Sequence, residues 1–294
     1  MKILLIEDER VQRMVIENLF EGTDHEVLVA ENGEEGWKII QETGVRMIIT
    51  DWIMPVLSGP ELIQRIRKAD LPGYSYVILL SAQDSTDNIV EGLEAGADDY
   101  MTKPFSAAEL MARLKIGQRI LTLQERLHDL ATRDPLTGLM NRRAFLEGAN
   151  AEYDRALRGR SPLAAAMIDI DGFKAINDLY GHETGDRAIQ SVAEALRLHR
   201  RTYDLLCRWG GEEFLVLMPG CDAASAAAAA ERVRVAIGSA VIDLPGGGGL
   251  RMTVSIGVAV GGPGANPRME ELIHRADTSM YKAKKGGKDR VCAE

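Results

Sequence analysis

The stretch DLLCRWGGEEFLVLM, residues 204–218, decides the fold of the second half of the chain. Two apolar runs flank the glycine pair Gly210-Gly211, which predicts two strands, 204–209 and 212–218, joined by a tight hairpin turn. A two-residue turn at the glycine pair places Glu212 at the tip of the hairpin. The chain therefore carries a carboxylate at an exposed corner of a predicted sheet.

A second apolar run, LAAAMID at residues 163–169, predicts a buried strand that ends in a carboxylate at Asp169. If the hairpin tip lies beside the end of this strand, Asp169 and Glu212 converge on Mg²⁺ together with a backbone carbonyl. These ligands are the minimum that two-metal phosphoryl transfer requires, in which the ions activate a hydroxyl and stabilise the leaving group.

The first 110 residues alternate short apolar runs with segments of helical periodicity. Continuous apolar strands that alternate with helices predict a doubly wound α/β domain with a five-stranded parallel sheet covered on both faces. The expected strands are 3–6, 26–30, 46–50, 76–80 and 99–102. The expected helices lie around 10–20, 33–42, 59–68 and 86–95, with a fifth that starts at Ser106.

Polar side chains follow four of these five strands, at the edge of the sheet where ligands bind. Carboxylates gathered there repel one another unless a hard cation lies among them, and Mg²⁺ prefers oxygen ligands of this kind. A lysine and a hydroxyl beside them complete a site for a phosphoryl group on a carboxylate. The residues at these positions are Glu7, Asp8, Asp51, Ser81 and Lys103.

The strings LLIED, DWIMP, LLSA and GADDYMTKPF resemble the receiver domains of two-component response regulators over about residues 1–120. The resemblance implies a flavodoxin-like fold, a cognate histidine kinase as partner and Asp51 as the phosphoacceptor. It also implies that Mg²⁺ is bound by Asp8, Asp51 and the carbonyl of Ile53, with the acid Glu7 in the next shell in place of the commoner aspartate.

Three further receiver residues follow from the same resemblance. Ser81 and Tyr100 are the expected switch pair, and Lys103 is the expected phosphate-sensing lysine. The peptide bond between Lys103 and Pro104 is expected to be cis.

A helix is predicted from Ala107 to about Thr132 and continues the last helix of the first domain as a linker, 107–132. Apolar residues recur in it at alternating steps of four and three, which predicts a parallel homodimeric coiled coil of two heptads. Packing against one of the chain's own domains is the alternative. The residues of this seam are Ile116, Ile120, Leu123, Leu127 and Leu130.

The second half resembles the GGDEF family of diguanylate cyclases across residues 130–294, with the domain itself at 133–294. The strings that carry this resemblance are DPLTGLMNRRAF, MIDIDGFKAINDLYGHETGD, RWGGEEF, TVSIGVAV and ADTSMYKAKKGGKDR. The resemblance implies an α/β fold whose sheet is akin to the palm of nucleotide cyclases and polymerases. It implies synthesis of cyclic di-GMP from two GTP with release of pyrophosphate, in a homodimer because each domain holds one GTP.

By that resemblance, Asp169, the carbonyl of Ile170 and Glu212 bind Mg²⁺, and Glu213 supports the second ion. Either Glu212 or the metal removes the proton from the attacking 3′-hydroxyl, and the residues do not separate these roles. Lys174 adds positive charge at the phosphates.

The nucleotide contacts are expected from three segments. Asn177 and Asp186 read guanine, because a carboxylate accepts from N1–H and the 2-amino group that adenine lacks, and His182 lies near the same base. The backbone N–H groups of Phe173 and Lys174 open a helix and hold the β- and γ-phosphates. Lys284 and Lys288 add positive charge, and a solvated tail is the alternative for this lysine pair.

The string RTYD at residues 201–204 is an RxxD motif, placed where the family carries its product-inhibition site. Arg201 and Asp204 are therefore expected to bind cyclic di-GMP as an inhibitor, with Arg232 as a second contact. The alternative is an exposed ion pair three residues apart.

Composition bounds the remaining function classes. The 294 residues carry a net charge of -9, and the first 110 hold 9 Lys and Arg against 21 Asp and Glu, which opposes nucleic-acid binding. Three cysteines without paired spacing indicate a reducing cytoplasm. The run at the N-terminus is too short and too acidic for a signal peptide or membrane anchor. Two rival functions remain, a silent GGDEF module that signals by protein contact and a DNA-binding output.

Overall fold

The computed structural model describes residues 1–82, 86–244, 247–261 and 268–294. The chain divides into two compact units, Met1–His128 and Asp129–Glu294, called here the first and second unit. No helix within the described residues combines the length and the apolar character needed to cross a membrane.

The first unit is built on a five-stranded sheet in the order β2-β1-β3-β4-β5, and every pairing in it is parallel. The predicted doubly wound parallel sheet is therefore confirmed. The strands are β1 (Lys2–Ile6), β2 (Glu26–Ala30), β3 (Met47–Asp51), β4 (Tyr76–Ser81) and β5 (Asp99–Thr102). The helices are α1 (Arg10–Asn18), α2 (Gly33–Thr43), α3 (Gly59–Lys68), α4 (Thr86–Glu94) and α5 (Ala107–Thr132).

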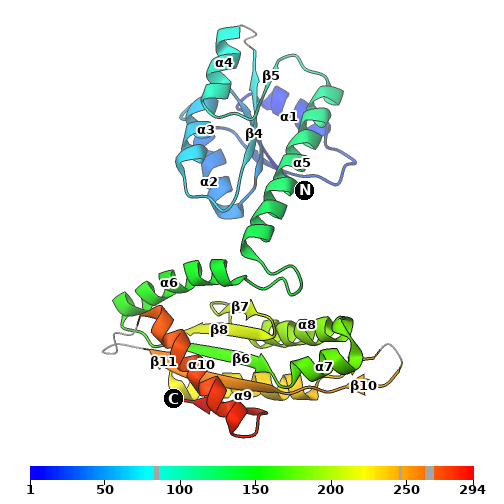
Figure 1. The fold of residues 1–294 in the computed structure, drawn as a ribbon. Coiled ribbons are helices and arrows are strands. Elements are labelled where there is room, and N and C mark those ends of the chain that lie inside the picture. Colours follow the sequence, from blue (N-terminus) through cyan, green and yellow to red (C-terminus); the bar gives the residue numbers. More distant parts are fainter. Residues whose placement is uncertain (83–85, 245–246, 262–267) are drawn as a thin grey trace. The chain divides into compact units, whose positions relative to one another are not determined.

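Helices cover both faces of this sheet (Figure 1). On one face, α2 and α3 bury Trp37 and Leu62 against alternate residues of the strands. On the other face, α1 and α5 bury Ile16 and Leu114 against the intervening residues. Because both faces are covered, the strands are apolar throughout rather than alternating, and their polar residues are left at the carboxyl edge.

Helix α5 has one buried face and one exposed face. Leu110, Leu114 and Leu121 are buried, and Gly117 lets the helix approach the sheet closely, since a Cβ there would lie 2.5 Å from the Tyr76 ring. The opposite face carries four of the five residues of the predicted coiled-coil seam, whereas Ile120 packs partly against the core of the sheet. The four side chains are exposed at 53% for Ile116, 47% for Leu123, 61% for Leu127 and 73% for Leu130, while Ile120 is half-buried.

The second unit contains a five-stranded mixed sheet in the order β12-β11-β6-β8-β7. The central strand β6 runs antiparallel to both neighbours, and the edge pair β11 and β12 is parallel. These strands are β6 (Leu163–Ile170), β7 (Leu205–Gly210), β8 (Glu213–Pro219), β11 (Val254–Gly261) and β12 (Arg290–Ala293). A short ribbon pairs β9 (Ile242–Asp243) with β10 (Gly249–Leu250).

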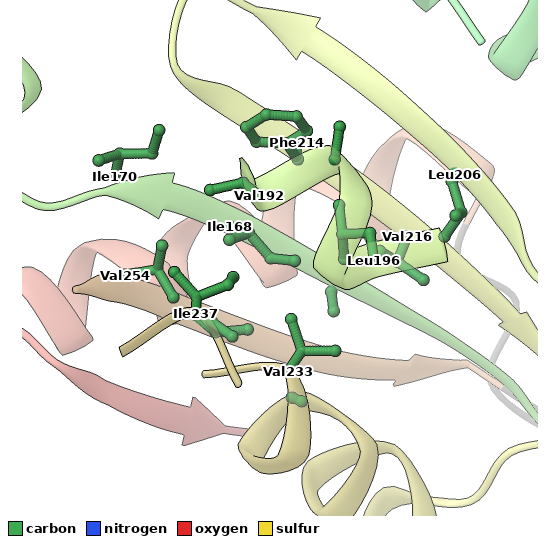
Figure 2. Packing of buried hydrophobic residues seen from close by; sticks show 14 of the residues in the cluster. Ile168, Ile170, Val192, Leu196, Leu206, Phe214, Val216, Val233, Ile237 and Val254 are labelled. Atoms are coloured by element: carbon green, nitrogen blue, oxygen red, sulfur yellow. The ribbon is translucent and has the colours of Figure 1, made fainter. Parts of the chain in front are cut away.

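Helices also cover both faces of the second sheet. They are α6 (Arg142–Gly159), α7 (Phe173–Tyr180), α8 (His182–His199), α9 (Ala223–Ser239) and α10 (Met269–Lys285). Figure 2 shows the core on the α7, α8 and α9 side, where Ile168 and Phe214 meet Val192 and Ile237. The other core lies under α6 and α10. Alternate residues of β6 therefore belong to different cores, and the odd-numbered ones, including Asp169, face α6 and α10.

The hairpin differs by one residue from its prediction. The turn is formed by Gly211 and Glu212, with Gly211 at φ +53°, rather than by Gly210 and Gly211. The reason is a register shift between Arg208 and Gly210 that leaves Trp209 as an extra residue in β7. Glu212 therefore lies within the turn itself.

Candidate active site and phosphoacceptor site

Three carboxylates converge at the carboxyl edge of the first sheet. Oxygens of Glu7, Asp8 and Asp51 all lie within 4.8 Å of one another, the only such group of metal-ligand side chains among the described residues. Glu7 is buried, whereas Asp51 is half-buried and Asp8 is exposed. Oxygen ligands at this spacing suit a hard divalent cation such as Mg²⁺.

Lys103 links two of these carboxylates. Its ammonium lies 2.7 Å from Oε2 of Glu7 and 2.7 Å from Oδ1 of Asp51. Lys103 reaches this position from the loop after β5, where its bond to Pro104 is cis, as expected. The structure thus brings together Glu7, Asp51 and Lys103 as the sequence predicts.

Burial dominates the electrostatics of this cluster. It raises the pKa of Glu7 and of Asp51, and hydrogen bonds from Lys103 offset only part of the increase. Burial alone would lower the pKa of Lys103, but its bonds to the two carboxylates raise it above its usual value. A second positive charge near Asp51 is therefore favourable, which fits the predicted Mg²⁺ site.

The expected switch residues lie one strand away. Ser81 ends β4 and is buried, and Tyr100 in β5 is buried with its ring edge-on to Trp52. Ile53 lies in the loop that follows Asp51, and its side chain is exposed. The register of the sheet places Ser81 beside Thr102, the residue that precedes Lys103.

In the second unit, the hairpin tip lies beside the end of β6. Asp169 is paired directly with Glu213 across the strands, and Glu212 precedes Glu213 in the turn. The side chain of Asp169 is 5% exposed, and the Lys284 ammonium lies 2.6 Å from its Oδ2. Lys284 comes from the last turn of α10, so three separate elements meet here.

Burial raises the pKa of Asp169 to about 6. The hydrogen bond and charge of Lys284 lower this pKa in part, whereas the charges of Glu212 and Glu213 raise it. Burial and the nearby Asp277 also raise the pKa of Glu213. Desolvated carboxylates that repel one another and attract a lysine form a site that favours added positive charge. The chemistry of these carboxylates suits a divalent cation, although the three do not form a group as close as that of Glu7, Asp8 and Asp51.

Asp169→Asn is expected to raise the thermal unfolding midpoint in metal-free buffer by about 2–4 °C near pH 7.5. The folded carboxyl has a pKa of about 6 against an ordinary value of 3.8, so the folded state holds a proton that the unfolded state releases between these values. The stability of the native chain therefore falls as pH rises through this window, and asparagine removes that loss.

Circular dichroism melts from about pH 4 to about pH 7.5 with a chelator present measure this difference. At about pH 4, Asp169 is protonated in the folded state and about half ionised in the unfolded state, so the difference between the midpoints of the variant and the native chain should be small there. If the difference in unfolding midpoint between Asp169→Asn and the native chain does not grow with pH, burial does not raise the pKa of Asp169.

Asn177 lies at the contact between α7 and α8. Its Oδ1 is buried and has no hydrogen-bond partner in the described structure. A Cβ on Gly185 would lie 2.0 Å from this oxygen and 3.2 Å from the Phe173 ring. The absence of a side chain at Gly185 thus makes room for the Asn177 amide, which is left with an unmatched acceptor for a donor on a ligand.

The other predicted nucleotide contacts lie around this point. Lys174, His182 and Asp186 are exposed on α7 and the first turns of α8. Phe173 and Lys174 form the first turn of α7, where backbone N–H groups lack helical partners. Lys288 is exposed in the turn after α10, and unlike Lys284 it makes no described ion pair with Asp169.

The RxxD motif forms a compact turn. Asp204 is buried, and its Oδ2 accepts a hydrogen bond from the backbone N–H of Arg201 at 2.7 Å. The guanidinium of Arg201 is directed to the sulfur of Cys221 instead, at 3.0 Å. Burial raises the pKa of the Cys221 thiol, and the charges of Arg201 and Arg232 lower it, so the two arginines lie near one thiol. The exposed ion pair considered above does not form.

Comparison with family models agrees with both units. Residues 131–290 match the diguanylate cyclase GGDEF domain, and residues 3–115 match the response regulator receiver domain. The chain belongs to the GGDEF family. Its first unit is a receiver domain, and the strings and the parallel sheet described above agree with that assignment.

Individual GGDEF proteins are similar over different parts of the chain. The response regulator PleD from Caulobacter vibrioides is 35% identical over 99% of this chain and 65% of its own length. The diguanylate cyclase DgcM from Escherichia coli (strain K12) is 40% identical over 58% of this chain and 40% of its own length. This chain therefore spans less than two thirds of either relative.

A crystal structure provides the corresponding fold. The coiled coil and GGDEF domain of DgcB from Caulobacter crescentus, in complex with c-di-GMP, aligns with a TM-score of 0.58 and 32% identity. The alignment covers 64% of this chain and 98% of that one. The α/β GGDEF fold predicted for the second half is confirmed.

Some features of the GGDEF domain were not singled out from the sequence. Trp209 carries the Arg142 guanidinium over its ring, 4.1 Å from the centroid, and meets the edge of Phe145. Arg142 and Trp209 border a cleft of about 520 Å³ that reaches Glu213. The only sequence signal was their presence in the strings RWGGEEF and NRRAF, which give no indication that the two strings pack together.

Proposed function

We propose that the chain is a diguanylate cyclase that condenses two GTP into cyclic di-GMP and releases two pyrophosphates. The observation that carries this proposal is the meeting of Asp169 with the Glu212 turn, beside Lys284. A buried acid, two acids at a hairpin tip and a lysine can hold a divalent ion and a triphosphate together. Membership of the GGDEF family supports the same activity.

In the proposed reaction, the 3′-oxygen of one GTP forms a bond to the α-phosphorus of the other. The bond from that phosphorus to the bridging oxygen of the β-phosphate breaks, and pyrophosphate leaves with the electron pair. Asp169, the Ile170 carbonyl and Glu212 would hold Mg²⁺, and Glu213 would support a second ion. Bound Mg²⁺ would supply charge stabilisation for the phosphate oxygens and lower the pKa of the attacking hydroxyl.

The chain's own residues supply the remaining functions. Lys284 and the first-turn N–H groups of Phe173 and Lys174 bind the phosphates, with Lys288 adding positive charge. Asn177 and Asp186 select guanine, with His182 beside it. Glu212 would accept the hydroxyl proton, or it would act only as a ligand that holds Mg²⁺ near this hydroxyl.

Incubation of the purified chain with GTP and Mg²⁺, followed by chromatography of the nucleotides, tests the activity. We expect cyclic di-GMP and pyrophosphate from GTP and no corresponding product from ATP. The alternative is a silent GGDEF module that binds GTP or cyclic di-GMP and signals by protein contact. That alternative is favoured if no dinucleotide forms even with a phosphate mimic bound at the receiver.

We further propose that phosphorylation of Asp51 by a histidine kinase raises the cyclase rate by favouring a homodimer. Two GTP must be held face to face, so two GGDEF domains are needed. The exposed seam from Ile116 to Leu130 provides an apolar stripe that a second copy can cover. Phosphorylation then shifts the population toward the dimer in which the domains meet.

Asp51→Asn is expected to abolish stimulation by a small phosphodonor and to leave the basal cyclase rate within about threefold of native. The amide keeps the size of the side chain but cannot accept the phosphoryl group. Rates with and without the phosphodonor, measured as pyrophosphate release, provide the check. Stimulation that persists in Asp51→Asn would place control outside the receiver.

The RxxD turn is proposed as the site of product inhibition. Arg201 and Arg232 are exposed and their charges both act on the Cys221 thiol, and guanidinium groups stack on or pair with a guanine dinucleotide. Asp204 itself is buried and orders the turn, which suggests that it holds Arg201 in place.

Arg201→Ala is expected to leave the initial rate within about twofold of native and to weaken inhibition by added cyclic di-GMP at least about tenfold. The guanidinium lies on the turn before β7 and is bonded to Cys221 rather than to the catalytic acids. Initial rates over a series of product concentrations give the inhibition constant. An unchanged constant rules out Arg201 as a contact for the inhibitor.

A further inference from the structure

The segment between α5 and α6 is bound to the strand that leads into the catalytic turn. The backbone N–H of Met140 donates to the Leu206 carbonyl at 3.1 Å, and the N–H of Arg208 donates to the Met140 carbonyl at 3.1 Å. Met140 thus pairs with β7 at Cys207, and Arg133 pairs with Met140, all within the second unit.

The same segment holds the last turn of α5. Asn141 donates its side-chain amide to the Ala131 carbonyl and its backbone N–H to the Thr132 carbonyl, both at 2.8 Å. Its side-chain oxygen accepts from Ala144 and begins α6. A displacement of the end of α5 is therefore transmitted to residues 133–141 rather than absorbed by a loose linker.

Arg208 connects this segment to the catalytic turn through its side chain. Nη1 donates to both carboxylate oxygens of Asp134, at 3.1 and 3.3 Å, and Nε donates to the carbonyl of Gly211 at 3.0 Å. The Arg208 and Asp134 side chains are only 18% and 16% exposed. A charge-assisted contact at this depth is stronger and less screened than a surface ion pair.

Asp134 is itself fixed. Its Oδ1 accepts from the backbone N–H of Thr137 at 2.8 Å and from the Thr137 hydroxyl at 2.7 Å. Gly211, at the other end of the connection, is exposed and directly precedes Glu212. Glu212 is in a two-residue turn next to an irregular pairing, so little of the β-ladder restrains it. The Arg208 side chain supplies a restraint that the ladder does not.

We propose that Arg208 is a positioning residue that sets the place of Glu212, and that Asp134 links this position to the end of the linker helix. The proposal rests on the cyclase activity proposed above and adds to it a physical connection between α5 and the catalytic turn. Arg208 touches no proposed substrate group, so it acts on the reaction only through the turn.

The test compares Arg208→Gln and Asp134→Asn with a control that removes an exposed ion pair, Arg143→Gln. Arg143 pairs with Glu147 on α6, and the two side chains are 84% and 66% exposed. Asp134→Asn keeps a side-chain oxygen that can accept from Thr137, but it removes the charge that pairs with Arg208. Hydrogen–deuterium exchange of peptides that cover residues 208–216 reports the turn directly and requires no catalysis.

We expect exchange at the turn to accelerate at least about fivefold in both variants and to stay unchanged in Arg143→Gln. We expect kcat to fall about tenfold or more while KM for GTP stays within about threefold, because misplacement of a reacting group costs rate rather than binding. The double variant should be no slower than Arg208→Gln alone, since both changes break one connection.

Three outcomes overturn the proposal. They are unchanged exchange at the turn, a loss of kcat that tracks only a lower unfolding midpoint, and multiplicative effects in the double variant. If the native chain forms no cyclic di-GMP, the proposed function fails, whereas the exchange measurement still decides whether Arg208 restrains the turn.

Discussion

Glu212→Gln is expected to lower kcat for cyclic di-GMP synthesis by about 10²–10⁴-fold. The change replaces one carboxylate oxygen by an amide and keeps the shape of the side chain. It removes either the proton acceptor for the 3′-hydroxyl or a metal ligand, and both roles require the negative charge. Because Glu212 lies in a turn, the substitution leaves the cores on either side of the sheet intact.

The matched control is Glu270→Gln on α10. Glu270 is an exposed acid that lines the same cleft as Glu213, the neighbour of Glu212, so the control removes one carboxylate charge close to the hairpin. Turnover is measured as pyrophosphate release at saturating GTP, with unfolding midpoints recorded for both variants. If Glu212→Gln retains more than about a tenth of the native kcat, Glu212 is neither the proton acceptor nor an essential metal ligand.

The parallel sheet of the first unit was predictable because its buried strands are continuous apolar runs that are followed by polar residues. Glu7 and Asp51 stand out against fully apolar runs, and parallel pairing then brings them to one edge. The bridge that Lys103 makes between them was not predictable from the spacing. It depends on the path of the loop after β5, which a pattern of apolar residues does not describe.

The hairpin shows where sequence patterns become inexact. Glycine pairs indicate a tight turn, but they do not reveal the extra residue Trp209, whose side chain packs against Arg142 and Phe145. This packing uses a segment about 65 residues earlier in the chain, beyond the reach of any local rule. The predicted turn was therefore one residue too early, although the strands and the placement of Glu212 near Asp169 follow from the pattern.

The C-terminal lysines also show that sequence patterns do not describe long-range packing. From sequence alone, Lys284 and Lys288 were equal candidates for a phosphate site or a solvated tail. The structure separates them, because Lys284 lies in the last turn of α10 and pairs with the buried Asp169, whereas Lys288 is exposed in the turn beyond. Which lysine faces β6 depends on how α10 packs across the sheet, and that packing is long-range.

Gly185→Ala is expected to lower kcat/KM for GTP by about 10–100-fold, mainly through a higher KM. The new Cβ would lie 2.0 Å from Oδ1 of Asn177 and 3.2 Å from the Phe173 ring. Gly185 is buried within α8, between the buried Thr184 and Ala188, so the helix has little room to retreat. The Asn177 amide must therefore move away from the position in which its free oxygen can meet the base.

The control for this substitution is Gly238→Ala in α9, where a Cβ would have nothing within 4 Å. Alanine is the better helix former by about 1 kcal/mol, so both variants gain the same intrinsic helix propensity and differ only in the contact with Asn177.

Rates with GTP and with inosine triphosphate, which lacks the 2-amino group, separate guanine recognition from general damage. Loss of recognition should reduce the preference for GTP over the inosine nucleotide in Gly185→Ala alone, because displaced Asn177 no longer pairs with the base. A preference that stays unchanged while both rates fall equally would mean that Asn177 holds α7 against α8 and does not read guanine.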